Sequence, residues 1–452
     1  MIKIKPQNPK GVRDFLPIEN KNREYIIDVL CKQFELYGFE SIYTPAFERL
    51  ETLVGKYGEE GEKLLFKILN SGNFLSDEET LNTIKTNPEL TSKITAMISS
   101  KGLRYDHTVP LARFVSQHQN ELTFPFRRYI IGPVWRADRP QKGRYQEFFQ
   151  CDIDVVGVKS LLNEIEIIEL ANSVFNILNL NVEIKINNKN IFNGLCQFFN
   201  AEKDSILIST IIDKWDKIGE EKVIEELMKL ETFTDNNVNE FVEILKNNDL
   251  ASLKGKNETI DKGIEEIEYL MNHTKVESLM FDGRLVRGLD YYTGTVFEVV
   301  SKELSYGSIA GGGRYDNLTE IFGMKDMAGV GFSFGLDRIY DVMIELNKFK
   351  DIPKRKKILI LNLEESLTNK YLELLSNFRK IGMTSELYPV KSKMDKQLGY
   401  ADKKQFDYAL ILGEDELSKQ QVSIKNLVKR TQETYSLSYF EKPNDTLIDN
   451  FS

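Results

Sequence analysis

The sequence predicts an α+β fold built on a mixed, mostly antiparallel sheet, with a helical insertion and a separate C-terminal α/β domain. Two apolar strand-like stretches, 124–136 and 146–158, flank a polar, basic tip, which is typical of an antiparallel hairpin. Residues 189–278 are polar and mostly helical in pattern, with little strand signal. Beyond residue 357 strand and helix patterns alternate, as in a mainly parallel sheet.

The first part of the chain contributes helix and strand signals in turn. From Ile18 to Gly38 apolar residues recur at three- and four-residue spacing, which predicts an amphipathic helix. A strand follows through Tyr43 and is broken at Pro45. Residues 59–103 are expected to be mostly helical, with a polar loop at SGNFLSDEET. After the hairpin come a helix over 160–178 and a short strand, VEIKIN.

Strand signals resume after the helical block. They lie at RLVRGLDYYTGTVFEVV and SIAGGGRYDNL, and GVGFSFGLDRIYDVMIEL is predicted to change from strand to helix near Leu336. DIPKRKK, residues 351–357, has the composition of a linker. The predicted division is therefore a first domain in two parts, 1–188 and 279–350, an inserted helical domain, 189–278, and a C-terminal α/β domain, 356–452.

The composition is that of an ordinary soluble globular chain, with 452 residues, 41% hydrophobic and 29% charged. The net charge of −9 argues against a protein that coats nucleic acid non-specifically, because such binding needs many Lys and Arg contacts to phosphate. Residues 351–452 are close to neutral, which is compatible with polyanion docking there and equally with ordinary variation in surface charge.

The three cysteines and three histidines form no recognisable framework. No CxxC pair is present and the histidines are scattered, so we expect a reducing compartment without disulfides or a zinc site. No apolar window is long enough for a membrane span, and the N-terminal residues lack the apolar run of a secretory signal. A cytoplasmic location is the expectation.

Three arginines, Arg136, Arg287 and Arg338, stand in or beside apolar strand segments, bordered by glycine or aromatic residues. A buried arginine must be paired, because an unpaired buried charge costs several kcal/mol. The fork-shaped guanidinium suits phosphate and carboxylate oxygens. Together they favour a polyanionic ligand. The alternative is an internal salt bridge for each, with the neighbouring Asp138, Asp290 or Asp337.

The glycine-rich segments do not form a standard nucleotide motif. Gly311–Gly313 would either let a ligand approach the backbone closely or make a tight turn between strands. The run 329–335 has the wrong spacing for a dinucleotide fingerprint, and no GxxxxGK[ST] loop exists. ATP, if bound, would therefore lie on an antiparallel sheet.

Acidic, amide and hydroxyl side chains accompany the arginines. The strand period of two places Gln150, Asp152 and Asp154 on one face. Paired acids and amides suit an ammonium group, and tyrosines suit a small aromatic or amide ligand; simple hydrogen bonding at a sheet surface is the alternative for the two acids. The remaining candidates are Asp106 and Thr108 in LRYDHTVPLARF, and Tyr291, Tyr292 and Tyr315 beside the glycine segments.

These segments resemble the motifs of class II aminoacyl-tRNA synthetases. GPVWRADRPQKGRYQEFFQCDID is similar to the second class motif and GVGFSFGLDR to the third, whereas the first, around Tyr43, Pro45 and Glu48, is weak. LVRGLDYYTG and AGGGRYDNL resemble two segments of the histidyl-tRNA synthetase family in particular. KGVRDFLP, KQLGYADKK and ILGEDEL also match, so the resemblance covers essentially the whole chain.

The resemblance implies roles for the matching residues. Arg136, Arg287 and Arg338 would be the catalytic arginines, the first and last on the ATP α- and γ-phosphates and Arg287 on the histidine carboxylate and the α-phosphate. Arg144 would join the ATP site, and Glu147 would orient the adenine or a Mg²⁺ ion. For histidine, the implied residues are Asp106, Thr108 and Gln150 at the α-ammonium group, Asp154, Tyr292 and Tyr315 at the imidazole, and Tyr291 in the same site. For the tRNA acceptor stem, they are Arg139 and Gln141.

The activity implied is a two-step reaction. L-Histidine would be activated with ATP, bound with Mg²⁺ as a substrate complex, to histidyl-adenylate and pyrophosphate, and then transferred to the 3′ end of tRNA(His). No tightly bound cofactor and no membrane partner is implied. The family also implies a homodimer with the first motif at its interface, and anticodon reading by residues 356–452.

The sequence departs from the commonest bacterial pattern at a few positions. Asp106 and Asp154 each stand where a glutamate is usual, so the ligand or backbone must lie closer by one methylene. His107 replaces a leucine or glycine and is expected to be a core or second-layer residue rather than a catalytic one. Residues 61–100 are longer than in many members, and the sequence suggests no physical reason for this.

Two other functions compete with this interpretation. One is a non-catalytic histidine-binding regulator, like the paralogue that partners ATP phosphoribosyltransferase; such proteins typically lack the C-terminal domain and often the active-site arginines, which are present here. The other is a class II synthetase for another amino acid, such as proline or threonine. RGLDYY and GGGRYD count against the second.

Overall fold

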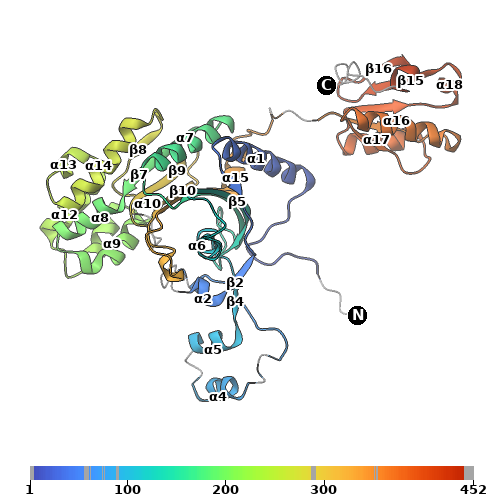
Figure 1. The fold of residues 1–452 in the computed structure, drawn as a ribbon. Helices are drawn as coiled ribbons and strands as arrows, with labels where there is room; N and C mark the ends of the chain where they lie inside the picture. Colours follow the sequence, from blue (N-terminus) through green and yellow to red (C-terminus); the bar gives the residue numbers. More distant parts are fainter. Residues whose placement is uncertain are drawn as a thin grey trace. The chain divides into compact units, whose positions relative to one another are not determined.

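A computed structural model of the chain describes residues 5–54, 61, 63–73, 75, 77–87, 91–286, 292–350, 352 and 355–441. The chain divides into two compact units, Met1–Lys350 and Asp351–Ser452, each with a sheet of its own (Figure 1). Within the described residues, none of the helices is long and apolar enough to cross a membrane.

The first unit is built on an eight-stranded sheet in the order β1-β5-β6-β11-β10-β9-β7-β8. The two outermost pairs, β1 with β5 and β7 with β8, are parallel, and the five pairs between them are antiparallel. The predicted mixed, mostly antiparallel sheet is confirmed. The strands are β1 (Glu40–Ser41), β5 (Phe126–Trp135), β6 (Glu147–Val156), β7 (Val182–Asn188), β8 (Leu279–Phe281), β9 (Thr295–Ser301), β10 (Ser308–Tyr315) and β11 (Gly329–Gly335).

One face of this sheet is covered by helices. Phe334 of β11 packs against Phe34 and Phe175, and its ring centroid lies 5.7 and 5.8 Å from theirs. Successive residues of a strand point to opposite faces, so Phe334 points to the helical face and Ser333 to the other. These rings join the sheet to the three covering helices, which are α1 (Pro17–Leu36), α7 (Leu162–Ile177) and α15 (Leu336–Glu345) (Figure 1). The predicted change from strand to helix at Leu336 is confirmed.

The opposite face carries the polar side chains of the strands. The helix α6 (Thr108–Gln117) lies on this side, where Leu111 and Val115 pack against Phe126 and Val156 at one end of β5 and β6 (Figure 1). Apolar contacts therefore close that end, and the polar residues further along β6 stay together on the same face.

Two local predictions need correction. Within residues 59–103 the structure has the helices α4 (Glu78–Thr86) and α5 (Thr91–Ile98), but the described residues also contribute two strands that were not expected. These are β3 (Lys67–Ile68) and β4 (Lys101–Leu103), which form a three-stranded sheet with β2 (Phe47–Arg49); β2 is followed by α2 (Leu50–Leu53). Helix α4 begins inside the predicted polar loop because the Asp77 carboxylate accepts the N–H of Thr80 as an N-cap.

Residues 284–286, where a strand was expected to begin, are not in a strand, and the next strand among the described residues is β9 from Thr295. Asp282 is the cause, because its backbone carbonyl accepts the N–H of Leu285 and its carboxylate accepts the N–H of Arg284. These bonds close a turn. The N–H groups of Arg284 and Leu285 are used within it and cannot donate to a neighbouring strand. Gly311–Gly313 lie within β10, paired with both neighbouring strands, so the tight-turn alternative is wrong.

Residues 189–278 are helical, as the pattern predicted. Rings of Phe199 and Phe233 pack on Phe241 with centroids 5.4 and 5.2 Å apart, which gives the segment apolar contacts of its own. Its status as a separate domain stays a prediction. The helices are α8 (Lys189–Phe198), α9 (Ser205–Ile212), α10 (Trp215–Ile218), α11 (Glu220–Leu227), α12 (Asp235–Asn247), α13 (Leu250–Leu253) and α14 (Glu258–His273).

The second unit has a five-stranded sheet in the order β13-β12-β14-β15-β16. Only the first two pairs are parallel, because β15 and β16 form a hairpin that turns at residues 427–430, so the sheet is less parallel than predicted. Its elements are β12 (Lys357–Ile360), α16 (Thr368–Lys380), β13 (Thr384–Leu387), α17 (Met394–Lys403), β14 (Tyr408–Ile411), α18 (Glu414–Ser418), β15 (Gln421–Asn426), β16 (Thr431–Ser436) and α19 (Ser438–Glu441).

Candidate active site

The candidate site follows the polar face of β6. Gln150, Asp152 and Asp154 lie on one face, as the strand period predicted. Each is flanked by two neighbours in register, one on β5 and one on β11. The neighbours are Gly132 and Gly335 for Gln150, Ile130 and Ser333 for Asp152, and Arg128 and Gly331 for Asp154.

Asp154 is held by a cation and a hydroxyl group. Its Oδ2 lies 2.5 Å from Nη2 of Arg128, and the Tyr315 hydroxyl donates to its Oδ1 at 2.5 Å. The Arg128 side chain is completely buried, and so is nearly all of Asp154. A charge pair this deep is stable only when its remaining polar atoms are also paired.

Several buried polar atoms around this pair lack partners. Among the described residues, Nε and Nη1 of Arg128, Oδ1 of Asp152 and Oε1 of Gln150 have no hydrogen-bond partner. Buried polar groups in proteins are nearly always paired, and a bound ligand is one way to pair them. These four atoms therefore outline a site for a small ligand that carries both donors and acceptors.

Burial changes the acidity of both aspartates. It raises the pKa of Asp154 to about 6, against the opposing effect of Arg128 and the Tyr315 hydroxyl group. It raises the pKa of Asp152 to about 7, where Arg128 opposes and the neighbouring Asp154 adds to the shift. The site has two carboxyl groups, Asp152 and Asp154, and one arginine, Arg128. When both carboxyl groups are ionised, one negative charge remains that a cationic ligand could neutralise.

Gly331 makes room for this arrangement. A Cβ atom at this position would overlap Oδ1 of Asp154 and lie 3.3 Å from the ring of Tyr315. Any larger residue in the middle of β11 would therefore push the carboxylate away from the tyrosine. The glycines of GVGFSFG thus serve close packing within a sheet rather than a phosphate-binding turn.

Asp106 and Thr108 stand at the start of α6, beside the same face. The Asp106 carboxylate is buried and accepts the N–H of Val109 at 3.1 Å, which fixes the first turn of the helix. His107 is also buried, with Nε2 3.2 Å from the carbonyl of Gly132. Burial, Arg104 and Arg128 lower its pKa, so His107 is neutral and belongs to the interior.

Gln150 occupies the middle of the site. Its Nε2 donates to the Ser333 hydroxyl at 2.9 Å, which leaves the side-chain carbonyl oxygen as an acceptor. Along β6, Gln150 lies four residues, or about 14 Å, from Asp154 at the usual rise per strand residue. The acid and tyrosine group is therefore separated from the hairpin end by the length of a small molecule.

Arg136 lies at the hairpin end of the same face. Its Nε donates to the carbonyl of Tyr105 at 3.1 Å, and its guanidinium lies 4.1 Å from the Tyr105 ring centroid and 5.2 Å from that of Phe148. The aspartate offered as its internal partner, Asp138, lies 3.7 Å from Arg144 instead. Arg136 is thus oriented by a carbonyl and two aromatic rings.

Arg338 is the third residue of α15, which follows β11 directly. Its Nε donates to the carbonyl of Gly143 at 2.9 Å and its Nη1 to that of Ser308 at 2.5 Å. Asp337, the carboxylate offered as an internal partner for it, accepts from Arg13, Arg23 and the N–H of Phe149. The acid next to Arg338 is therefore engaged by other groups.

The hairpin tip places the remaining predicted residues near the surface. Gln141 and Arg144 exchange backbone hydrogen bonds of 3.2 and 2.9 Å, which closes the tip. The side chains of Arg139, Gln141 and Arg144 are exposed. Glu147 is exposed as well and accepts from Nε1 of Trp135, its partner in register, at 2.7 Å.

Five of the six positions of the RGLDYY segment, 287–291, lie outside the described residues, among them Arg287, Asp290 and Tyr291. Tyr292 is described and buried, and its ring fills the space that a side chain at Gly313 would need. Because Gly313 and Tyr315 point to the same face of β10, the end of this segment reaches the site.

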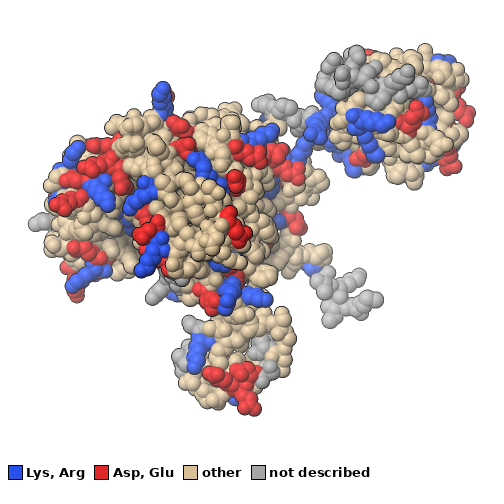
Figure 2. Space-filling view, in the orientation of Figure 1, with Lys and Arg blue, Asp and Glu red and all other residues tan. Residues whose placement is uncertain are grey.

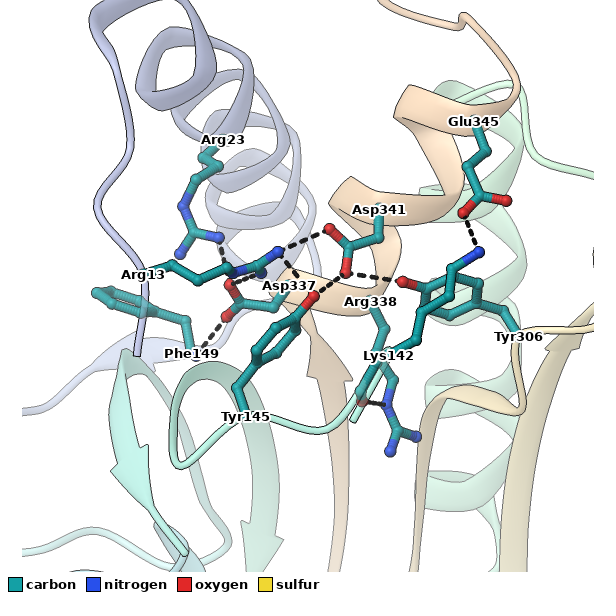
Figure 3. Close-up of polar contacts among 11 residues, drawn as sticks. Arg13, Arg23, Lys142, Tyr145, Phe149, Tyr306, Asp337, Arg338, Asp341 and Glu345 are labelled. Carbon is teal, nitrogen blue, oxygen red and sulfur yellow. Dashed lines mark hydrogen bonds and ion pairs between the residues drawn. The ribbon is translucent and has the colours of Figure 1, made fainter. Parts of the chain in front are cut away.

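Sequence reasoning missed several residues of the site. Arg128 carried a usable signal, because it lies in one strand of the predicted hairpin and Asp154, of opposite charge, lies in the other. Arg13, Tyr145, Tyr306 and Asp341 had no such signal, since they come from four separate segments and meet only at the start of α15 (Figure 3).

The surface of the first unit carries charges of both signs. On the face shown in Figure 2, acidic and basic side chains are interspersed over the first unit and do not form one continuous basic area. Such a surface is unlike that of a protein that coats nucleic acid by charge alone. A polynucleotide would have to be recognised through local contacts.

Two protein families together match most of the chain. The family described as histidyl-tRNA synthetase matches residues 11–77 and 75–339, and the family described as anticodon binding domain matches residues 357–442. The histidine–tRNA ligase of Azobacteroides pseudotrichonymphae is 47% identical, covering 98% of this chain and 97% of the relative.

Solved structures agree with this fold. The histidyl-tRNA synthetase of Nostoc sp. PCC 7120 has a TM-score of 0.80 at 29% identity, covering 97% of this chain and 99% of that one. An ATP phosphoribosyltransferase regulatory subunit/histidyl-tRNA synthetase of Bacillus halodurans has a TM-score of 0.69 at 20% identity, covering 88% and 97%. The second likeness concerns the fold alone, so it does not separate an enzyme from a regulator.

Proposed function

The chain belongs to the histidyl-tRNA synthetase family, and we propose how its own residues divide the work of joining histidine to tRNA. In the first step a carboxylate oxygen of L-histidine attacks the α-phosphorus of ATP, the bond to the β-phosphate breaks, and histidyl-adenylate and pyrophosphate form. In the second step the terminal ribose hydroxyl of tRNA(His) attacks the histidyl carbonyl and AMP leaves. The C-terminal unit is an anticodon-binding domain.

One observation supports this division most strongly. The buried, incompletely paired group of Arg128, Asp152 and Gln150 lies on the sheet face that ends at Arg136. A ligand with an ammonium group and two ring nitrogens can pair those atoms, and the arginines beyond it suit phosphate. Specificity for histidine over other amino acids would then follow, because another amino acid would leave buried polar groups of the site unpaired.

We assign the histidine site to the closed end of this face. Asp154 and Tyr315, which are hydrogen-bonded to each other, would bind the imidazole together with Tyr292. The α-ammonium group would be bound by the groups nearer the middle of β6 and the start of α6, which are Gln150, Asp106 and Thr108. Tyr291 is assigned to the same site from the resemblance alone.

The ATP site is assigned to the hairpin end. Arg136 and Arg338 would neutralise charge on the α- and γ-phosphates, Arg144 would bind ATP from the hairpin tip, and Arg287 would bridge the histidine carboxylate and the α-phosphate. Such fixed positive groups lower the barrier because they are already oriented before charge develops. Mg²⁺ would enter with ATP, since phosphate oxygens are its usual ligands, and Glu147 would contact either it or the adenine.

The remaining partners are proposals of the same kind. Arg139 and Gln141, exposed in the hairpin tip, would approach the first base pair of the acceptor stem. A homodimer is supported by the first class motif, where Tyr43 is 77% exposed. A cytoplasmic location is supported by the three free cysteines.

The decisive measurement is ATP–pyrophosphate exchange with each amino acid in turn. We expect exchange with histidine alone. No exchange with any amino acid would favour a histidine-binding regulator, and exchange with another amino acid would favour a different synthetase.

Arg287→Ala tests the proposed catalytic arginine. We expect the adenylation rate to fall about 10²- to 10³-fold, the scale observed when one charge-stabilising donor is removed. Near-normal exchange in this variant would rule out the role, and Arg430→Ala, at an exposed turn of the C-terminal unit, provides the matched control.

A further inference from the structure

A polar cluster at the start of α15 has no part in the roles assigned above. Figure 3 shows it between the N-terminal segment, the hairpin, the loop before β10 and the helix itself. Its members are far apart in sequence; Arg13 and Asp341, for example, are separated by 328 positions. The cluster consists of Arg13, Arg23, Tyr145, Tyr306, Asp337 and Asp341.

Asp341 is the centre of this cluster. Its Oδ2 accepts from the hydroxyl groups of Tyr145 and Tyr306 at 2.7 and 2.9 Å, and its Oδ1 accepts from Nη1 of Arg13 at 3.0 Å. One carboxylate of α15 therefore joins three other segments. Its side chain is only 13% exposed, so water competes little for these bonds.

The two tyrosines lie on the segments that hold Arg338. Arg338 donates to the carbonyls of Gly143 and Ser308. Gly143 is two residues before Tyr145, and Ser308 is two residues after Tyr306, so Asp341 fixes the chain beside both acceptors. Residues three apart on a helix are neighbours, which places Asp341 next to Arg338 itself.

Close packing leaves little freedom between the two segments. Gly143 has φ of +72°, and a Cβ atom there would lie 3.1 Å from the Tyr306 ring. Burial and the Asp341 carboxylate raise the pKa of Tyr145 to about 12 and also raise that of Tyr306. Both hydroxyl groups therefore remain protonated donors at neutral pH.

The charges of the cluster balance without Arg338. Asp337 lies 2.7 Å from Arg13 and 2.6 Å from Arg23, and Arg13 bridges to Asp341. The Arg13 guanidinium also stacks on the Tyr145 ring, 3.6 Å from its centroid. Two carboxylates of α15 are thus matched by two arginines from the N-terminal part of the chain.

We propose that Asp341 is a positioning residue for ATP: with Arg13 it holds the hairpin return and the start of β10 so that the carbonyls of Gly143 and Ser308 orient Arg338 toward the phosphates. This inference rests on the proposed function of Arg338. It adds a role for the N-terminal segment, whose Arg13 acts on the phosphate end of the site without contacting ATP.

The test is histidine-dependent ATP–pyrophosphate exchange by the full chain carrying Asp341→Ala. We expect the KM for ATP to rise about 10- to 100-fold, the scale of a small misplacement of a binding group, with the KM for histidine unchanged. In the Arg338→Ala background the same change should add nothing, because Asp341 acts through Arg338. The matched control is Lys348→Ala, which removes an ion pair of 3.3 Å with Glu303, a residue of the same loop as Tyr306, and should leave both KM values unchanged.

Equal rises in the two KM values, or additive effects with Arg338→Ala, would overturn the inference. If Asp341→Ala does not fold, the double variant Tyr145→Phe/Tyr306→Phe removes only the two hydroxyl groups. It should raise the KM for ATP in the same selective way, and an unchanged KM would overturn the inference as well. Absence of exchange in the unmodified protein would instead count against the proposed function.

Discussion

Arg128 shows how one buried side chain sets the character of a site. It is the third residue of β5, fully enclosed, with an ion pair of 2.5 Å between its Nη2 and Asp154. Its Nε and Nη1 are buried and have no hydrogen-bond partner among the described residues. The arginine is therefore both the counter-ion of an acid and, in our proposal, part of the cavity that receives histidine.

Replacing Arg128 by Met should destabilise the first unit by about 3–5 kcal/mol, because it leaves the Asp154 carboxylate buried without its cation. Adding Asp154→Asn should recover much of that loss, since the neutral amide needs no counter-ion. Thermal unfolding of the two single variants and the double variant measures this coupling. Additive losses would show that the pair is not energetically connected.

Asp152 gives the protein a pH dependence of a definite sign. Burial raises its pKa to about 7 in the fold, while the unfolded chain titrates near the ordinary value of about 4. The folded protein thus retains a proton that the unfolded chain has lost, and the stability contributed by protonated Asp152 falls as the pH rises through this window.

Asp152→Asn removes this titration. Between about pH 5 and pH 8, the variant should gain on the order of 2 kcal/mol of stability relative to the unmodified protein. Melting temperatures of both proteins across this range provide the comparison. Parallel curves would show that Asp152 does not hold a proton in the fold.

At the scale of elements, β11 and the helix α15 that follows it divide two tasks. In the strand, Gly331 lies next to Asp154 and has no side chain, so the Asp154 carboxylate and the Tyr315 hydroxyl group can form their hydrogen bond over it. The helix then carries Arg338 in its first turn and Asp341 in its second, where the cluster in Figure 3 forms. A strand followed at once by a helix thus brings the histidine end and the phosphate end of the proposed site into one rigid piece.

Gly331→Ala should raise the KM for histidine about tenfold or more, which corresponds to about 1.4 kcal/mol, because the new methyl group displaces the Asp154 carboxylate. Gly399→Ala is the control: it is a helix position with open space around it, so the change should stabilise the helix slightly and leave the KM unaltered. Exchange kinetics at varied histidine concentration make the comparison. An unchanged KM for Gly331→Ala would show that Asp154 does not contact the substrate.

The whole molecule consists of two units that each have a sheet and an apolar core. In the second unit, Tyr371 and Phe378 of α16 are buried with residues of β12, β14 and β15. A unit that encloses its own core can fold without its neighbour. The family matches divide at the same place, with synthetase residues up to 339 and anticodon-binding residues from 357.

Cutting the chain between the two units, at residues 351–354, should preserve the first step of the reaction in the first unit. We expect residues 1–350 to retain histidine-dependent exchange but to charge tRNA(His) on the order of 100-fold less efficiently, as expected for about 3 kcal/mol of lost contact energy. Aminoacylation and exchange assays on the same preparation provide the measurement. Loss of exchange with retained folding would mean that the second unit takes part in activation.

The sequence alone determined the features that depend on local period. The hairpin, the common face of Gln150, Asp152 and Asp154, and the change from strand to helix at Leu336 follow from residue spacing, because a side chain's direction is set by its own backbone. The predictions of a polar loop at 71–80 and of a strand at 284–286 were wrong, because the Asp77 side chain caps a helix in the first case and Asp282 turns the backbone in the second.

The tertiary structure decided which distant residues meet. Arg128 and Asp154 are joined by strand register, Arg314 pairs with Glu164 on the opposite, helical face, and Asp341 collects partners from three other segments. No local pattern specifies such contacts, because they depend on how separate elements pack. The family, the fold and the polar face were readable from the sequence. The counter-ion of Asp154 in the proposed histidine site and the carbonyl groups that bind Arg338 were visible only in the folded chain.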